Sequence, residues 1–145
     1  MRADIFVTTE EPTLNILQYG REVGLWNGTL ERRRGVFRKM FGMFKSAYPD
    51  LKGYTLCLTV GYKSERSKHS FGSYCDYEKK RIVLRGKLSV ITFLHEIAHA
   101  LFPFRESEAK WGEDYGFANE AFAEIWSNVH FYQVFPEKMG QRAEL

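Results

Sequence analysis

A five-residue pattern in the second half of the chain places two histidines and a glutamate where they could serve one metal ion. His95, Glu96 and His99 belong to the sequence HEIAH, and on a helix the two histidines lie one turn apart on the same face. Two imidazoles about 6 Å apart along the axis can converge on zinc, with Glu96 beside the water at its open position. Zinc lowers the pKa of that water towards about 7, and the carboxylate can pass its proton to a leaving amine. The pattern predicts one Zn²⁺ per chain and a hydrolytic reaction.

A catalytic zinc needs a third protein ligand, and no histidine lies between His99 and His130 to supply it. A carboxylate is therefore expected. Glu120 and Glu124 stand four residues apart in the last predicted helix, so one can bind the ion while the other hydrogen-bonds a ligand histidine. The polar stretch before that helix offers four further candidates, which the spacing leaves open: Glu106, Glu108, Glu113 and Asp114.

The run Asn119-Glu120-Ala121-Phe122-Ala123-Glu124, which follows HEIAHA after a loop, resembles the second motif of the gluzincin metallopeptidases. In that family HExxH is followed, after roughly twenty residues, by NExxS/A-D/E. The resemblance implies a zincin-like fold, a protein or peptide substrate, and His95, His99 and Glu120 as zinc ligands. It also implies Glu96 as the general base. Glu124, which stands where thermolysin-like members have Asp, would orient a ligand histidine, with Asn119 as a further residue beside the ligands.

The size of the chain and the run FAEIW…FP are similar to the compact ImmA/IrrE-type or minigluzincin-like forms, over about residues 70 to 136. A chain of this size lacks the large C-terminal subdomain with which bigger gluzincins stabilise the transition state. An OH or imidazole donor near the zinc could do so here, and the candidates are Tyr115, His130 and Tyr132. Each also has a plain structural interpretation: Tyr115 as a loop packing residue, the other two as partly exposed helix residues. His130 lies about 280° around the helix from Glu120, away from the ligand face.

The elements that must position these residues follow from apolar spacing and from turn residues. Thr29 is a plausible N-cap for a helix to about Tyr48, whereas residues 13–26 are ambiguous. Strands are expected in residues 54–62, 71–77 and 80–86, with a turn at 78–80. Two further helices are expected from Ser89 to about Phe102 and from about Ala118 to Phe135, separated by a polar stretch at 105–116. This order predicts one α+β domain over residues 1–145, with a small, mostly antiparallel sheet packed against helices. Residues 81–85 could then be an exposed edge that binds the substrate as an added strand.

The composition is that of a globular protein: 44% of the 145 residues are hydrophobic and 27% are charged, which excludes a disordered chain. The N-terminal sequence contains no apolar run of signal-peptide length, and no stretch of the chain is apolar enough to span a membrane. Cys57 and Cys75 fit neither a disulfide framework nor a CxxC zinc motif, so we expect buried thiols in a reducing compartment. These features predict a cytoplasmic protein with no membrane partner.

The charge is unevenly distributed and suggests an alternative function. Up to Val90 there are 17 basic and 9 acidic residues (+8), and from Ile91 onward 4 basic and 9 acidic (−5). A basic face of the first long helix could contact nucleic acid, although such faces are usually just solvated: Arg32, Arg33, Arg34, Arg38, Lys39 and Lys45. The alternative is a latent or non-catalytic zincin-fold module that binds a protein or nucleic-acid partner. The presence of Glu96 argues against it, because a purely structural zinc has no use for that carboxylate.

Overall fold

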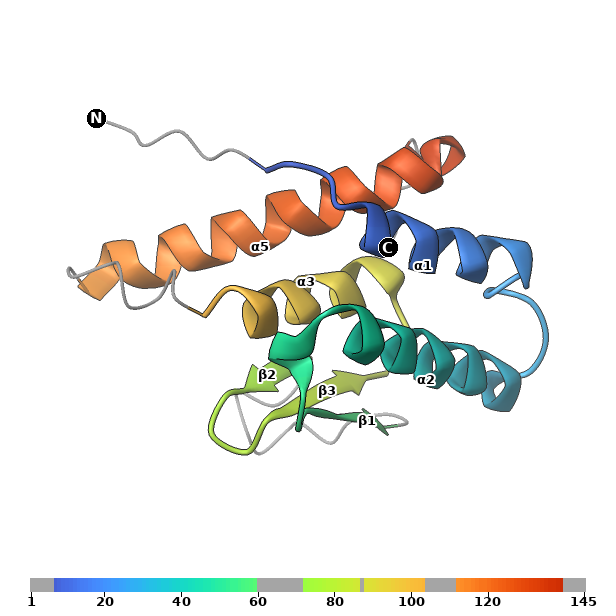
Figure 1. Ribbon diagram of the computed structural model, residues 1–145, viewed down its shortest axis with the longest axis horizontal. Helices are drawn as coiled ribbons and strands as arrows, with labels where there is room; N and C mark the ends of the chain where they lie inside the picture. Colours follow the sequence, from blue (N-terminus) through green and yellow to red (C-terminus); the bar gives the residue numbers. More distant parts are fainter. Residues whose placement is uncertain (1–6, 60–71, 87, 104–111, 140–145) are drawn as a thin grey trace.

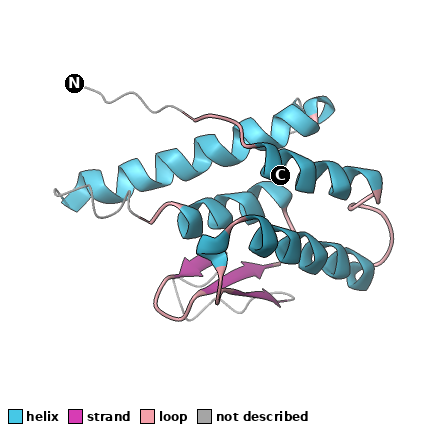
Figure 2. Cartoon of the chain, viewed as in Figure 1, coloured by secondary structure: helices cyan, strands magenta, loops and turns pink. Residues whose placement is uncertain are grey.

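The computed structural model describes residues 7–59, 72–86, 88–103 and 112–139, and for 112–119 it describes the backbone alone. Within these residues the chain forms four helices and a small sheet (Figures 1 and 2). The helices are α1 (Glu11–Glu22), α2 (Leu30–Ala47), α3 (Val90–Leu101) and α5 (Gly112–Val134), with a 3-10 turn η1 (Pro49–Leu51) after α2. The strands are β1 (Thr55–Thr59), β2 (Tyr74–Asp76) and β3 (Arg81–Arg85). The predicted α+β class is confirmed.

Helix α3 occupies the middle of the molecule, between α5 and the sheet, and α1 packs against both α5 and α2 (Figure 1). Ser89 begins α3 as its N-cap, since its hydroxyl accepts a hydrogen bond from the Thr92 N–H at 3.2 Å. The Phe93 ring is fully buried and packs edge-to-face against the rings of Phe37 and Phe44 of α2, at centroid distances of 5.4 and 5.8 Å. These contacts fix α3 against α2.

The sheet is mixed, which corrects the prediction of a mostly antiparallel sheet. β3 lies in the middle, antiparallel to β2 and parallel to β1. The predicted turn between β2 and β3 is present, and Asp76 Oδ1 accepts a hydrogen bond from the Lys79 N–H there at 3.1 Å. Residues 60–73 between β1 and β2 are too many for a tight hairpin, so sequence order does not decide which strands are neighbours. Because β3 is paired on both sides, the prediction that residues 81–85 form an exposed edge is wrong.

Helix α2 begins as predicted, with the Thr29 hydroxyl accepting a hydrogen bond from the Arg32 N–H at 3.1 Å. The ambiguous segment 13–26 contains most of α1. The Arg32 guanidinium donates hydrogen bonds to the carbonyl oxygens of Val23, Gly24 and Asn27. This arginine of the basic face therefore holds the α1–α2 loop.

Helix α5 begins at Gly112, six residues earlier than expected, and ends at Val134, one residue short of Phe135. Glu113 and Asp114 fall in its first turn, where the positive end of the helix dipole favours acidic residues. That local preference explains why part of a polar stretch is helical.

None of the described helices combines the length and hydropathy that a membrane-spanning segment requires. Cys57 and Cys75 are thiols, as expected, but both are partly exposed rather than buried.

A buried polar cluster joins the segment before α1 to α5, and its centre is His130. The imidazole is 0% exposed, so the expectation of a partly exposed residue is wrong. Its Nε2 accepts a hydrogen bond from the Glu10 N–H at 2.8 Å, and its Nδ1–H donates to the Trp126 carbonyl at 2.9 Å. The Glu10 carboxylate in turn accepts from the Tyr48 hydroxyl at 2.8 Å. These partners fix a neutral ring, and burial lowers the pKa of His130.

A histidine that is buried in its neutral form makes stability depend on pH. As the pH falls below the ordinary histidine pKa of about 6.5, the unfolded chain takes up a proton that folded His130 resists, so the free energy of unfolding decreases. We expect His130→Gln to remove this contribution, which is at most about 1.4 kcal/mol per pH unit. Urea unfolding of both proteins from about pH 7.5 to 5, with chelator present, measures it. Parallel plots of stability against pH for the two proteins would contradict the assignment.

Candidate metal centre

Two packed helices bring together the side chains that the sequence predicts as metal ligands. His95 and His99 lie one turn apart on α3, and Glu120 reaches them from α5, which packs along α3 (Figure 1). One ligand atom from each of the three residues lies within 4.8 Å of the other two, so the group could hold a metal ion. Among the described residues, no other group of this kind is present.

The carboxylate of Glu120 bridges the two imidazole rings. Its Oε1 lies 2.9 Å from His95 Nε2, and its Oε2 lies 3.2 Å from His99 Nε2. Ligand atoms around a tetrahedral zinc with bonds of about 2.0–2.1 Å lie about 3.3 Å apart, close to these separations. Two imidazoles and one carboxylate are a ligand set of catalytic zinc, and imidazole also suits copper, iron and nickel. The donors present therefore fit a transition metal with one coordination position left open.

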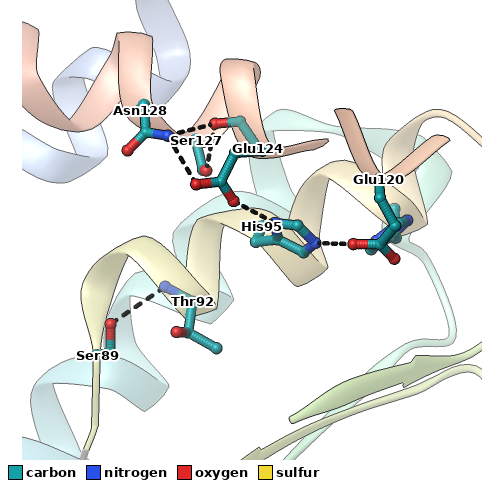
Figure 3. A network of polar contacts seen from close by, with 8 residues as sticks. Ser89, Thr92, His95, Glu120, Glu124, Ser127 and Asn128 are labelled. Carbon is teal, nitrogen blue, oxygen red and sulfur yellow. Dashed lines mark hydrogen bonds and ion pairs between the residues drawn. The ribbon is translucent and has the colours of Figure 1, made fainter. Parts of the chain in front are cut away.

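A second carboxylate from α5 lies behind His95, on the side away from Glu120 (Figure 3). Glu124 Oε1 is 3.4 Å from His95 Nδ1, and Glu124 Oε2 accepts a hydrogen bond from Asn128 Nδ2 at 3.1 Å. A proton on Nδ1 directed at Glu124 leaves Nε2 with its lone pair directed at the metal position. His95 thus lies between the two glutamates, one at each ring nitrogen.

Glu96 lies beside these residues and is almost completely buried, with 6% of its surface exposed. Burial, together with the charge of Glu120, raises the pKa of the Glu96 carboxyl to about 8. The group therefore has a high affinity for a proton, which suits a residue that must take up a proton and release it again. A divalent cation nearby would shift the balance back towards the charged carboxylate.

The centre opens into a cavity of about 420 Å³ whose opposite wall comes from the sheet. His95, Glu96, His99 and Glu120 form one side. The other side consists of residues in and next to β2: Ser73, Tyr74, Cys75 and Tyr77. Sequence reasoning missed these four residues, because only the position of β2 at the edge of the sheet brings them to the helices. The two tyrosines of this segment, one strand ahead of the helix that contains HExxH, were the available signal.

The remaining candidate residues are distributed as follows. Glu106 and Glu108 lie outside the described residues. Four residues belong to α5 by their backbone, but their side chains lie outside the description: Glu113, Asp114, Tyr115 and Asn119. Tyr115 is thus helical rather than part of a loop.

Neither His130 nor Tyr132 lines the cavity, so neither is placed to stabilise an oxyanion there. His130 uses both ring nitrogens in the cluster that holds α1. The Tyr132 hydroxyl is buried and has no hydrogen-bond partner in the described part of the chain. Tyr77 and Tyr74, from β2 and the turn after it, are the tyrosines that the described cavity contains.

No protein-family model, curated protein or solved structure matches this chain.

Proposed function

We propose that the protein is a small zinc-dependent metallopeptidase of the gluzincin type. The observation that carries the proposal is the convergence of His95, His99 and Glu120 next to a buried glutamate, Glu96, at the wall of an open cavity. A closed structural zinc site would contain four protein ligands and would not need that glutamate. An open position beside a proton-accepting carboxylate is the arrangement that hydrolysis requires.

In this proposal each residue has a separate task. His95, His99 and Glu120 hold the ion, and Glu124 orients His95 through its Nδ1. A bound zinc ion would supply Lewis acidity towards the peptide carbonyl and towards water. Glu96 removes a proton from the attacking water, keeps it in a buried environment, and delivers it to the nitrogen of the leaving amine. The position of Glu96 in the wall of the cavity, beside the three residues that would hold the ion, supports this task.

The position of β2 supports an extended peptide as substrate. Its antiparallel neighbour β3 covers one edge, and no described strand pairs with the other edge. Cys75, at the middle of β2, lines the cavity that contains Glu96. A peptide that added a strand to β2 would lie across the mouth of the cavity with its backbone held by main-chain hydrogen bonds.

The role of Glu96 is tested by Glu96→Gln. We expect this variant to bind one zinc per chain, as the unchanged protein does, and to lose about 10²–10⁴-fold in peptide hydrolysis, because the amide cannot accept the proton. Metal content is measured by elemental mass spectrometry, and hydrolysis by cleavage of a peptide library. Hydrolysis at the original rate would refute the mechanism, whereas zinc binding without hydrolysis in both proteins would favour a latent or non-catalytic module.

The role of Glu120 is tested by metal-dependent stability. Zinc at about one hundred times its dissociation constant should stabilise the protein by about 2.7 kcal/mol, and removal by a chelator should abolish the gain. We expect Glu120→Gln to lose most of this stabilisation. Glu78→Gln, which changes an exposed carboxylate in the β2–β3 turn, is the matched control and should keep it. Equal zinc stabilisation in both variants would exclude Glu120 as the third ligand.

A further inference from the structure

The side chain of Glu124 is held at both of its oxygens by different partners (Figure 3). Oε1 faces His95 Nδ1 at 3.4 Å, and Oε2 accepts from Asn128 Nδ2 at 3.1 Å. The same Asn128 nitrogen also donates to the main-chain carbonyl of Glu124 at 2.8 Å. One amide group therefore spans the backbone and the carboxylate of Glu124, and folds this long side chain back along its own helix.

This restraint matters because the side chain of Glu124 is 45% exposed, and a glutamate has several rotatable bonds to immobilise before it can hold a partner. A contact of 3.4 Å to a histidine is long, so little energy from that contact alone keeps the carboxylate in place. The Asn128 contact, by contrast, joins residues one helical turn apart on α5 and needs no contribution from α3.

We propose that Asn128 is a positioning residue for the metal centre. Its amide fixes the rotamer of Glu124, the Glu124 carboxylate faces Nδ1 of His95, and the ring is thereby held with Nε2 towards the metal position. The inference depends on the metal site of the proposed function and not on the peptidase reaction. It adds a third link, from Asn128 to Glu124 to His95, to the residues that contact the ion.

The neighbouring residue Ser127 provides a matched control. Its hydroxyl donates to the same main-chain carbonyl of Glu124, at 2.9 Å, but no contact joins it to the carboxylate. Ser127→Ala therefore removes a hydrogen bond from the same turn without releasing the carboxylate. If Asn128 acted only by stabilising the helix, the two alanine variants would behave alike.

The first experiment measures zinc affinity of the full chain by competition with a chromophoric chelator. We expect Asn128→Ala to weaken binding about 10-fold, within the range for residues that orient a metal ligand, and Ser127→Ala to leave it unchanged. In the Glu124→Ala background, Asn128→Ala should add nothing, because its target is gone. Unchanged affinity in Asn128→Ala, or an equal loss with and without Glu124, would overturn the proposal. Asn128→Leu, which keeps the volume, repeats the test if the alanine variant unfolds.

The second experiment needs neither metal nor activity. Crystal structures of chelator-treated Asn128→Ala and Ser127→Ala report where the Glu124 carboxylate lies relative to His95 Nδ1. We expect the carboxylate to leave this contact in Asn128→Ala and to keep it in Ser127→Ala. An unchanged Glu124 rotamer in Asn128→Ala would overturn the positioning role. If the unchanged protein failed to bind zinc, the proposed function would fall while this measurement still decided what Asn128 does to Glu124.

Discussion

The packing of α5 along α3 is the contact on which the candidate metal centre depends. Both histidines come from α3, and the carboxylates that meet them come from α5. Neither helix alone could form the three-residue group. A shift of one helix along the other by a single turn, about 5.4 Å, exceeds the distances between Glu120 and the two histidines and would separate them.

Aromatic side chains that do not line the cavity also join this helix pair. The Phe102 ring, directly after α3, packs edge-to-face with Phe122 at 4.9 Å and lies 6.0 Å from Trp126. The Trp126 ring also contacts the His130 ring in a tilted arrangement with centroids 4.4 Å apart, and His130 accepts a hydrogen bond from the main-chain N–H of Glu10. The segment before α1 is thus connected through buried groups to the turn of α5 that follows Glu124. The segment around Glu10, which is distant in sequence from the metal ligands, therefore helps to set the position of α5 and of the glutamates that it contributes.

The sequence predicted best those features that depend on neighbouring residues in one element. The spacing of His95 and His99, the cap at Thr29, the start of a helix at Ser89 and the β2–β3 turn are local, and all are present. The meeting of Glu120 with the histidines was expected from the resemblance to the second gluzincin motif, since the spacing alone left other carboxylates open. The parallel pairing of β1 with β3 was not predicted, because it depends on how a long connection is routed.

Residues with two plausible environments were also beyond sequence reasoning. The spacing of His130 is that of a residue on a helix surface. In the structure its two ring nitrogens are hydrogen-bonded, one to the Glu10 N–H and the other to the Trp126 carbonyl in the same helix. The ring is therefore buried without an unsatisfied polar group. The wall of the cavity formed by β2 contains no histidine or carboxylate that would have attracted attention. Tyr74 and Tyr77 reach the cavity because the strand order places β2 at the edge of the sheet.

The acidic character of the final third of the chain is explained in part by the carboxylates that gather at the candidate metal centre. Glu120 stands beside the buried Glu96, and its negative charge helps to raise the pKa of that group. Glu124 is a further carboxylate in this group, and it contacts His95, as Glu120 does. Like charges gathered around a partly buried site destabilise a fold unless a cation or strong donors offset them. Asn128 offsets part of the charge on Glu124, and the histidines offset part of that on Glu120. A divalent cation would offset the rest, and the same charge would then favour the ionised form of Glu96 that a general base requires.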